Sequence, residues 1–155
     1  MSPAPWLVFG VGNPSRGDDA LGPAFVERAQ LLLAPDVREG RLELLTDFQL
    51  QIEHALDLKG RQHVVFVDAS LRARAPFEYT RLAPARDATH TTHAMSPEAV
   101  LDTYREIVGP PPDSWLLAIR GERFELGEEL SPAAQVNLEA ALAFFVGDGG
   151  RVATS

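Results

Sequence analysis

The chain has 155 residues, a formal net charge of −8, 45% hydrophobic residues and no cysteine. This length and composition fit one folded domain, and the lack of cysteine excludes disulfides, iron–sulfur clusters and thiolate zinc sites, so any metal must be held by His, Asp or Glu. The acidic charge, together with the lack of a Lys/Arg-rich run, a leader-like N-terminus or a long apolar segment, favours a cytoplasmic protein that binds neither nucleic acid nor membrane.

The first expected strand is the apolar run 6–9, which enters a tight turn at 10–12. A helix is expected from Pro23, a residue that suits a first helical position. Its apolar face consists of Phe25, Val26, Ala29, Leu32 and Leu33. Two adjacent carboxylates, Asp18 and Asp19, therefore lie between the end of the strand and the start of the helix.

A dinucleotide-binding loop would fit the glycines at 10 and 12, but its third glycine position holds Ser15. Asp18 and Asp19 would also repel a pyrophosphate at the helix N-terminus. The alternative for the two aspartates is structural, because carboxylates cap helices and interact favourably with the helix dipole. The residues alone leave both interpretations of the aspartates open.

Further elements are expected along the chain. After a break at 34–36, a short strand is expected over 41–45 and a helix over 50–58 whose apolar side consists of Ile52, Ala55, Leu56 and Leu58. The run 63–68 predicts a buried parallel strand that ends in Asp68. Strands are also expected at 77–82, 114–119 and 124–126, with a loop over 84–92 and helices after the Ser-Pro pairs at 96–97 and 131–132. Residues 1–147 form one predicted α/β domain, and 148–155 form an expected mobile tail.

Strands that alternate with amphipathic helices predict an α/β fold: a mostly parallel, twisted sheet of about five strands with helices on both faces. In such sheets ligands bind at the carboxyl ends of the strands, where the strand order reverses. If the strands at 6–9 and 63–68 are neighbours, they lie about 4.8 Å apart. Asp19 and Asp68 would then face one crevice.

His93 lies in the loop before the predicted helix cap Ser96, and this loop can return to the same edge of the sheet. Asp19, Asp68 and His93 together offer two oxygen ligands and one nitrogen ligand, a set that suits a divalent ion such as zinc, nickel or iron. Asp68 could instead cap a turn, and His93 could be a surface histidine. His90 lies three residues from His93, but the segment does not have a helical pattern that would make the two a chelating pair.

Other histidines and a serine offer weaker alternatives. His54 and His63 are expected to be structural or solvent-facing. Ser15, Asp68 and His93 occur in the order of an α/β-hydrolase triad, but the G-x-S-x-G elbow that such enzymes require is missing around Ser15.

The motifs at 10–13 and 18–22, with Asp68 at the end of a buried strand and His93 before a helix, resemble the [NiFe]-hydrogenase maturation endopeptidases over essentially the whole chain. The resemblance implies a three-layer α/β/α domain that removes a short C-terminal peptide from the nickel-loaded precursor of a hydrogenase large subunit. It implies Asp19, Asp68 and His93 as metal ligands, with Asp19 and Asp68 as catalytic acidic residues. Nickel would be supplied by the precursor, and no nucleotide is required.

Two positions depart from the family pattern. The first acidic ligand is often glutamate, whereas Asp19 is one methylene shorter. A Gly-Gly-Thr segment thought to recognise the precursor is replaced by 46–51, as in members that serve cytoplasmic NAD-reducing hydrogenases.

The chemistry itself has two versions, and both use the same residues. In one, nickel polarises the scissile carbonyl or a water while Asp19 or Asp68 acts as base; in the other, nickel only recognises the precursor and the carboxylate pair activates water. A monomer is expected. The alternative function is a non-catalytic flavodoxin-like or nucleotide-binding module, which would bind a phosphate-bearing molecule at the loop 10–17.

Overall fold

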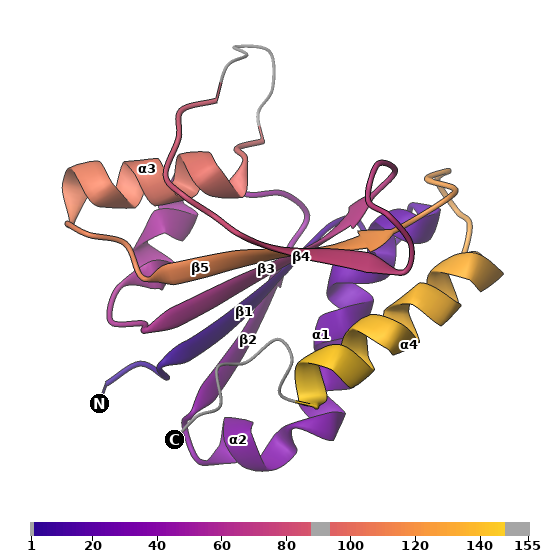
Figure 1. The fold of residues 1–155 in the computed structure, drawn as a ribbon, viewed down its shortest axis with the longest axis horizontal. Helices are drawn as coiled ribbons and strands as arrows, with labels where there is room; N and C mark the ends of the chain where they lie inside the picture. Colours follow the sequence, from indigo (N-terminus) through magenta and orange to yellow (C-terminus); the bar gives the residue numbers. More distant parts are fainter. Residues whose placement is uncertain (1, 88–93, 148–155) are drawn as a thin grey trace.

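The computed structural model describes residues 2–87 and 94–147, and its five strands form one sheet in the order β2-β1-β3-β5-β4 (Figure 1). The strands are β1 (Trp6–Val11), β2 (Leu42–Asp47), β3 (His63–Ser70), β4 (Phe77–Arg81) and β5 (Asp113–Arg120). Neighbouring strands run parallel except for the edge strand β4, which pairs antiparallel with β5. The predicted mostly parallel sheet of about five strands is confirmed.

Helices cover both faces of this sheet, as the α/β prediction required. They are η1 (Gly17–Ala20), α1 (Leu21–Leu32), α2 (Ala34–Arg38), η2 (Ile52–Leu58), α3 (Pro97–Ile107) and α4 (Pro132–Val146), where η marks 3₁₀ geometry. Figure 1 shows α1 and α4 on one face and α3 on the other, where it packs with η2. Among the described residues, no helix has the length and hydropathy needed to cross a bilayer.

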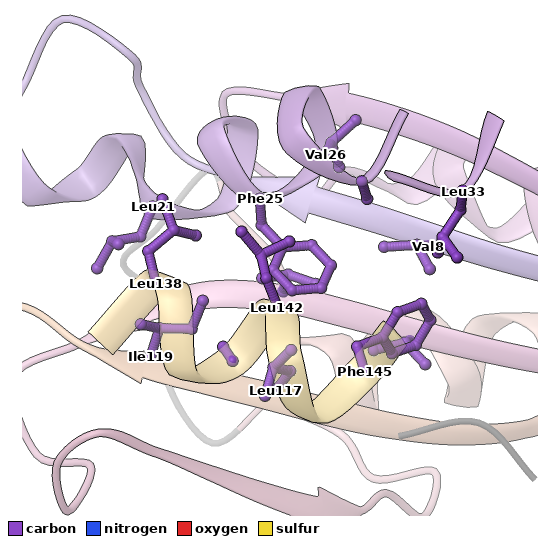
Figure 2. Close-up of a cluster of buried hydrophobic side chains, with 14 of the residues drawn as sticks. Val8, Leu21, Phe25, Val26, Leu33, Leu117, Ile119, Leu138, Leu142 and Phe145 are labelled. Atoms are coloured by element: carbon purple, nitrogen blue, oxygen red, sulfur yellow. The ribbon is translucent and has the colours of Figure 1, made fainter. Parts of the chain in front are cut away.

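The core has two halves because the central strands present apolar side chains to both faces. On β1, Leu7 packs with the η2 and α3 side, while its neighbour Val8 packs with the α1 and α4 side. Figure 2 shows the half on the α1 and α4 side, where Leu142 of α4 lies beside Phe25 of α1 and above Leu117 of β5. Burying each such large side chain contributes about 1.5–3 kcal/mol.

The two Ser-Pro helix starts are confirmed in detail. The Ser96 Oγ accepts a hydrogen bond from the Ala99 backbone N–H at 3.1 Å, and Ser131 Oγ accepts one from Ala134 at 3.2 Å. Each proline follows at the first helical position, where the missing N–H has no intrahelical partner to lose.

The start of α1 differs from the prediction. The helix begins at Leu21 rather than Pro23, because the turn η1 runs directly into it and Leu21 is buried against the sheet. Gly22 allows this close approach, since a Cβ atom there would lie 2.3 Å from the Val11 carbonyl oxygen of β1. In dinucleotide-binding folds the third glycine of the loop allows the helix to pack closely on the strand. Gly22 allows this close packing here.

Three apolar side chains that were expected on the buried faces of helices are exposed. Leu32, Ile52 and Leu56 have 49%, 63% and 61% of their surface exposed. For the last two the reason is helix type: η2 has three residues per turn, which rotates these side chains away from the face that an α-helix would bury.

Three further boundaries differ from the prediction. Residues 34–36, expected as a break, begin the short helix α2, because Pro35 is compatible with the first turn of a helix. Strand β3 continues two residues beyond Asp68. Residues 124–126 form no strand, because the segment around them bonds to the loop before η1: the Gly127 N–H donates to the Ser15 carbonyl at 2.7 Å.

Candidate active site

The candidate site lies at the carboxyl edge of the sheet, between β1 and β3. The chain places β2 on one side of β1 and then crosses to place β3 on the other, so the strand order reverses between β1 and β3. A crevice forms at such a point because the two connections leave on opposite faces. The expectation that β1 and β3 are neighbouring strands is confirmed.

Asp19 is held at this edge by the loop that follows β1. Its Oδ2 accepts a hydrogen bond from the Asn13 backbone N–H at 2.8 Å. The loop is tight: Gly12 has φ +146°, and a Cβ atom at Gly12 would lie 2.0 Å from the Asp19 carbonyl oxygen. Glycine at position 12 is thus a condition for the placement of Asp19.

Asp68 lies near the end of β3, beside Ala118 of β5 in the sheet register. Its pKa is raised from 3.8 to about 7, first by burial and secondly by the negative charge of Asp19, while a hydrogen bond from the Ala69 N–H opposes the rise. The influence of Asp19 means that the two carboxylates interact electrostatically. A carboxyl with a pKa near neutrality can take up and release a proton at physiological pH.

Asp19 and Asp68 line one cavity of about 380 Å³. Its walls come from the ends of β1 and β3, from residues 48–50 after β2, and from residues 94–97 before and at the start of α3. The walls are largely apolar, with Phe48, Phe66 and Met95 around the carboxylates. Sequence reasoning brought Asp19 and Asp68 together correctly, but it missed Phe48 and Met95 as wall residues because nothing local marks them.

His93 and His90 lie outside the described residues, so the third predicted ligand is not placed. The chain does return to the cavity immediately afterwards, since residues 94–97 line it. Within 2–87 and 94–147, no group of three His, Asp or Glu side chains has the arrangement of a metal site.

The other two histidines lie away from the two carboxylates. His54 is buried, its Nδ1 accepts from the Gln51 N–H at 2.8 Å, and its Nε2 lies 3.1 Å from Asp47 Oδ2, which is a structural arrangement. His63 begins β3 at the opposite end and stacks on Trp6 with ring centroids 4.4 Å apart.

Asp18, the neighbour of Asp19, has a different environment. Its side chain is completely buried and accepts hydrogen bonds from Glu122, Arg123 and Ser131. Burial by itself raises the pKa of Asp18, but these hydrogen bonds outweigh it and hold the pKa below 3.8. Of the two interpretations left open by the sequence, Asp18 takes the structural one, although it anchors a distant segment rather than capping a helix.

The rival sites find little support in this geometry. Ser15 is exposed and is not among the cavity-lining residues, so it does not face Asp68 as a nucleophile would. The Gly12 N–H, which a phosphate-binding loop would offer to its ligand, donates instead to the Asp47 carbonyl at 3.0 Å.

No protein-family model and no curated protein sequence matches the chain. Among solved structures it is similar to the [NiFe] hydrogenase maturation protease HycI from Thermococcus kodakarensis KOD1, with a TM-score of 0.70 and 24% identity over 93% of this chain and 91% of that chain. For the hydrogenase maturating endopeptidase HybD from E. coli the TM-score is 0.67 and the identity 25%, over 90% of this chain and 88% of that chain. For an endopeptidase from Escherichia coli studied in solution they are 0.70 and 24%, over 95% and 94%.

The chain therefore has the α/β fold of the hydrogenase maturation proteases. This similarity confirms the resemblance that its motifs indicate.

Proposed function

We propose that this protein is an endopeptidase that removes a short C-terminal peptide from the nickel-loaded precursor of a [NiFe]-hydrogenase large subunit. The observation that supports this most is the meeting of Asp19 and Asp68 across one cavity at the switch point of the sheet, in a chain with the fold of the maturation proteases.

In this proposal nickel is part of the substrate, the nickel-loaded precursor. Two carboxylates and an imidazole, from Asp19, Asp68 and His93, are chemically suited to a divalent ion and leave coordination positions free for the ligands that the precursor already provides. A proton on Asp68 must leave before that carboxylate can bind a cation, so metal binding here competes with protonation near neutral pH. A site with only three protein ligands favours an ion that arrives with the precursor's own ligands, and binding of that ion would report that nickel insertion is complete.

The cleavage step follows from the chemistry of Asp68. Its carboxylate accepts a proton from water as the water oxygen attacks the scissile carbonyl carbon, and returns the proton to the departing amide nitrogen when the C–N bond breaks. Asp19, held by the Asn13 N–H, would orient the attacking water or bind the nickel ion together with Asp68. Nickel, when bound, would position the C-terminal segment and polarise the carbonyl.

Residues 46–51 support a finer assignment within this function. This segment, which differs from the Gly-Gly-Thr version, places Phe48 in the wall of the cavity, where the residue is 61% exposed. An exposed ring beside the carboxylates provides an apolar contact for the precursor. We propose that the protein belongs with the cytoplasmic proteases that serve NAD-reducing hydrogenases.

The test is the intact mass of a nickel-loaded large-subunit precursor after incubation with the protein, beside the same precursor without nickel. Loss of one defined C-terminal peptide only in the presence of nickel is expected. The variant Asp68→Asn should abolish cleavage, while Asp113→Asn, an exposed aspartate at the other end of the sheet, should cleave like the wild type. Absence of cleavage of any cognate precursor, or full activity in Asp68→Asn, would overturn the proposal.

A further inference from the structure

Asp18 and Asp19 are adjacent in sequence but point in different directions. Both lie in η1, where successive side chains are about 120° apart because the helix has three residues per turn. Asp19 faces the cavity and is half-buried, whereas Asp18 has no exposed surface. A completely buried carboxylate next to a proposed catalytic residue requires an explanation.

The Asp18 carboxylate accepts four hydrogen bonds from one distant segment. Oδ2 accepts from the Glu122 N–H at 2.7 Å, the Arg123 N–H at 3.1 Å and the Ser131 Oγ–H at 2.7 Å. Oδ1 accepts from the Ser131 N–H at 2.7 Å. The carboxylate thus joins both ends of the segment 121–131, which connects β5 to α4.

Backbone contacts bring the same segment against the loop that positions Asp19. The Gly17 N–H donates to the Glu128 carbonyl at 3.0 Å, and the Asp18 N–H donates to the Arg123 carbonyl at 2.7 Å. A Cβ atom at Gly17 would lie 2.5 Å from that Arg123 carbonyl oxygen, so the two segments touch through their backbones. The segment 121–131 therefore also supports the loop that carries Asp19 through backbone contacts.

We infer that Asp18 is a positioning residue: its buried carboxylate fixes η1 against the segment 121–131 and thereby holds Asp19 opposite Asp68. The inference rests on the proposed endopeptidase function. Only a carboxylate satisfies all four donors, because it offers two oxygens that both accept. In the variant Asp18→Asn, the amide NH₂ must face either the Ser131 N–H or the three donors at Oδ2, so in each case it meets at least one backbone N–H that has lost its acceptor.

The first experiment compares Asp18→Asn with Asp102→Asn. Asp102 on α3 is also buried, but it pairs with Arg105 of the same helix and with Arg86 of the loop after β4, so it controls for the loss of a buried carboxylate elsewhere. The kcat for the nickel-loaded precursor is measured per folded molecule, with the folded fraction taken from near-UV circular dichroism. We expect kcat to fall at least tenfold in Asp18→Asn and to change less than twofold in Asp102→Asn. The reason is that displacing a catalytic group by about 1 Å can lower the rate by up to about 100-fold.

A spectroscopic readout separates positioning from simple destabilisation. The Asn13 amide donates to Asp19 and not to Asp18, so its NMR chemical shift and its hydrogen exchange report the placement of Asp19. Asp18→Asn should shift this amide signal and accelerate its exchange, while amides of β1 and β3 keep their protection. If Asp18→Asn does not fold, Ser131→Ala removes one of the four donors and should produce the same changes in smaller size.

The outcomes are distinct. If the wild type does not cleave the precursor, the proposed function fails, whereas Asn13 still tests the structural part of the inference. If the wild type cleaves and Asp18→Asn has unchanged kcat per folded molecule with an unchanged Asn13 signal, Asp18 is not a positioning residue.

Discussion

Replacing Asp68 with Asn should stabilise the protein at alkaline pH, although it removes the proposed catalytic base. In the folded protein burial, and secondly the charge of Asp19, raise the pKa of Asp68 from 3.8 to about 7. The unfolded chain has the ordinary value, so between these two pH values only the folded form keeps the proton. Ionisation of Asp68 therefore lowers the free energy of unfolding as the pH rises from about 4 to about 7.

The magnitude follows from this pKa difference. At about 1.4 kcal/mol per pH unit, the rise from 3.8 to about 7 corresponds to about 4 kcal/mol of stability lost above neutral pH. Asparagine has no charge to bury, but an incompletely bonded amide costs about 1–3 kcal/mol, which leaves a net gain of about 1–3 kcal/mol at about pH 8. Below about pH 4 the aspartate is neutral as well, and the gain disappears.

Urea denaturation in EDTA, followed by tryptophan fluorescence at about pH 4 and about pH 8, measures this difference. The exposed Asp113→Asn, which loses a surface ion pair with Arg81, should change stability by less than about 1 kcal/mol at either pH. A stability difference between Asp68→Asn and the wild type that is the same at both pH values would refute the reasoning, because it would mean that Asp68 ionises as freely in the folded protein as in the unfolded chain.

Two further predictions concern the cavity. Gly12→Ala should lower the free energy of unfolding by more than about 1 kcal/mol and abolish cleavage, because at φ +146° its Cβ would lie 2.0 Å from the Asp19 carbonyl oxygen. Gly40→Ala is the matched control: Gly40 has φ +75° but a Cβ there would meet no atom within 4 Å, so activity should be retained. Thermal unfolding and the cleavage assay check both, and equal losses in the two variants would contradict the steric argument. Phe48→Ala should raise KM for the precursor with little change in kcat or melting temperature, since the ring is exposed at the cavity wall; an unchanged KM would exclude a contact with the precursor.

The sequence alone was sufficient for the parts of the fold that depend on local chemistry. The apolar runs of β1 and β3 are buried on both faces and leave no doubt about a covered sheet. The Ser-Pro pairs begin helices because serine caps the free N–H groups and proline fits the first turn. The position of Asp68 near the end of β3 followed from the same pattern.

Other features depend on contacts between distant residues. The antiparallel direction of β4 and the 3₁₀ geometry of η2, which exposes Ile52 and Leu56, have no local signal of sufficient strength. The local pattern within 121–131 predicts a short strand, but backbone groups of this segment bond to the loop before η1 instead.

The two adjacent aspartates illustrate the division best. The sequence determined that a carboxylate would stand at the carboxyl end of β1, where it can face Asp68. The family resemblance assigned this place to Asp19, but the local chemistry gave no reason for that choice, because Asp18 and Asp19 carry the same group and differ only in direction. The tertiary structure decided this through Glu122, whose N–H lies 104 residues away along the chain and donates to Asp18, and through the other donors beside it. Those donors satisfy the Asp18 carboxylate in the interior, so Asp19 is the one left facing the cavity.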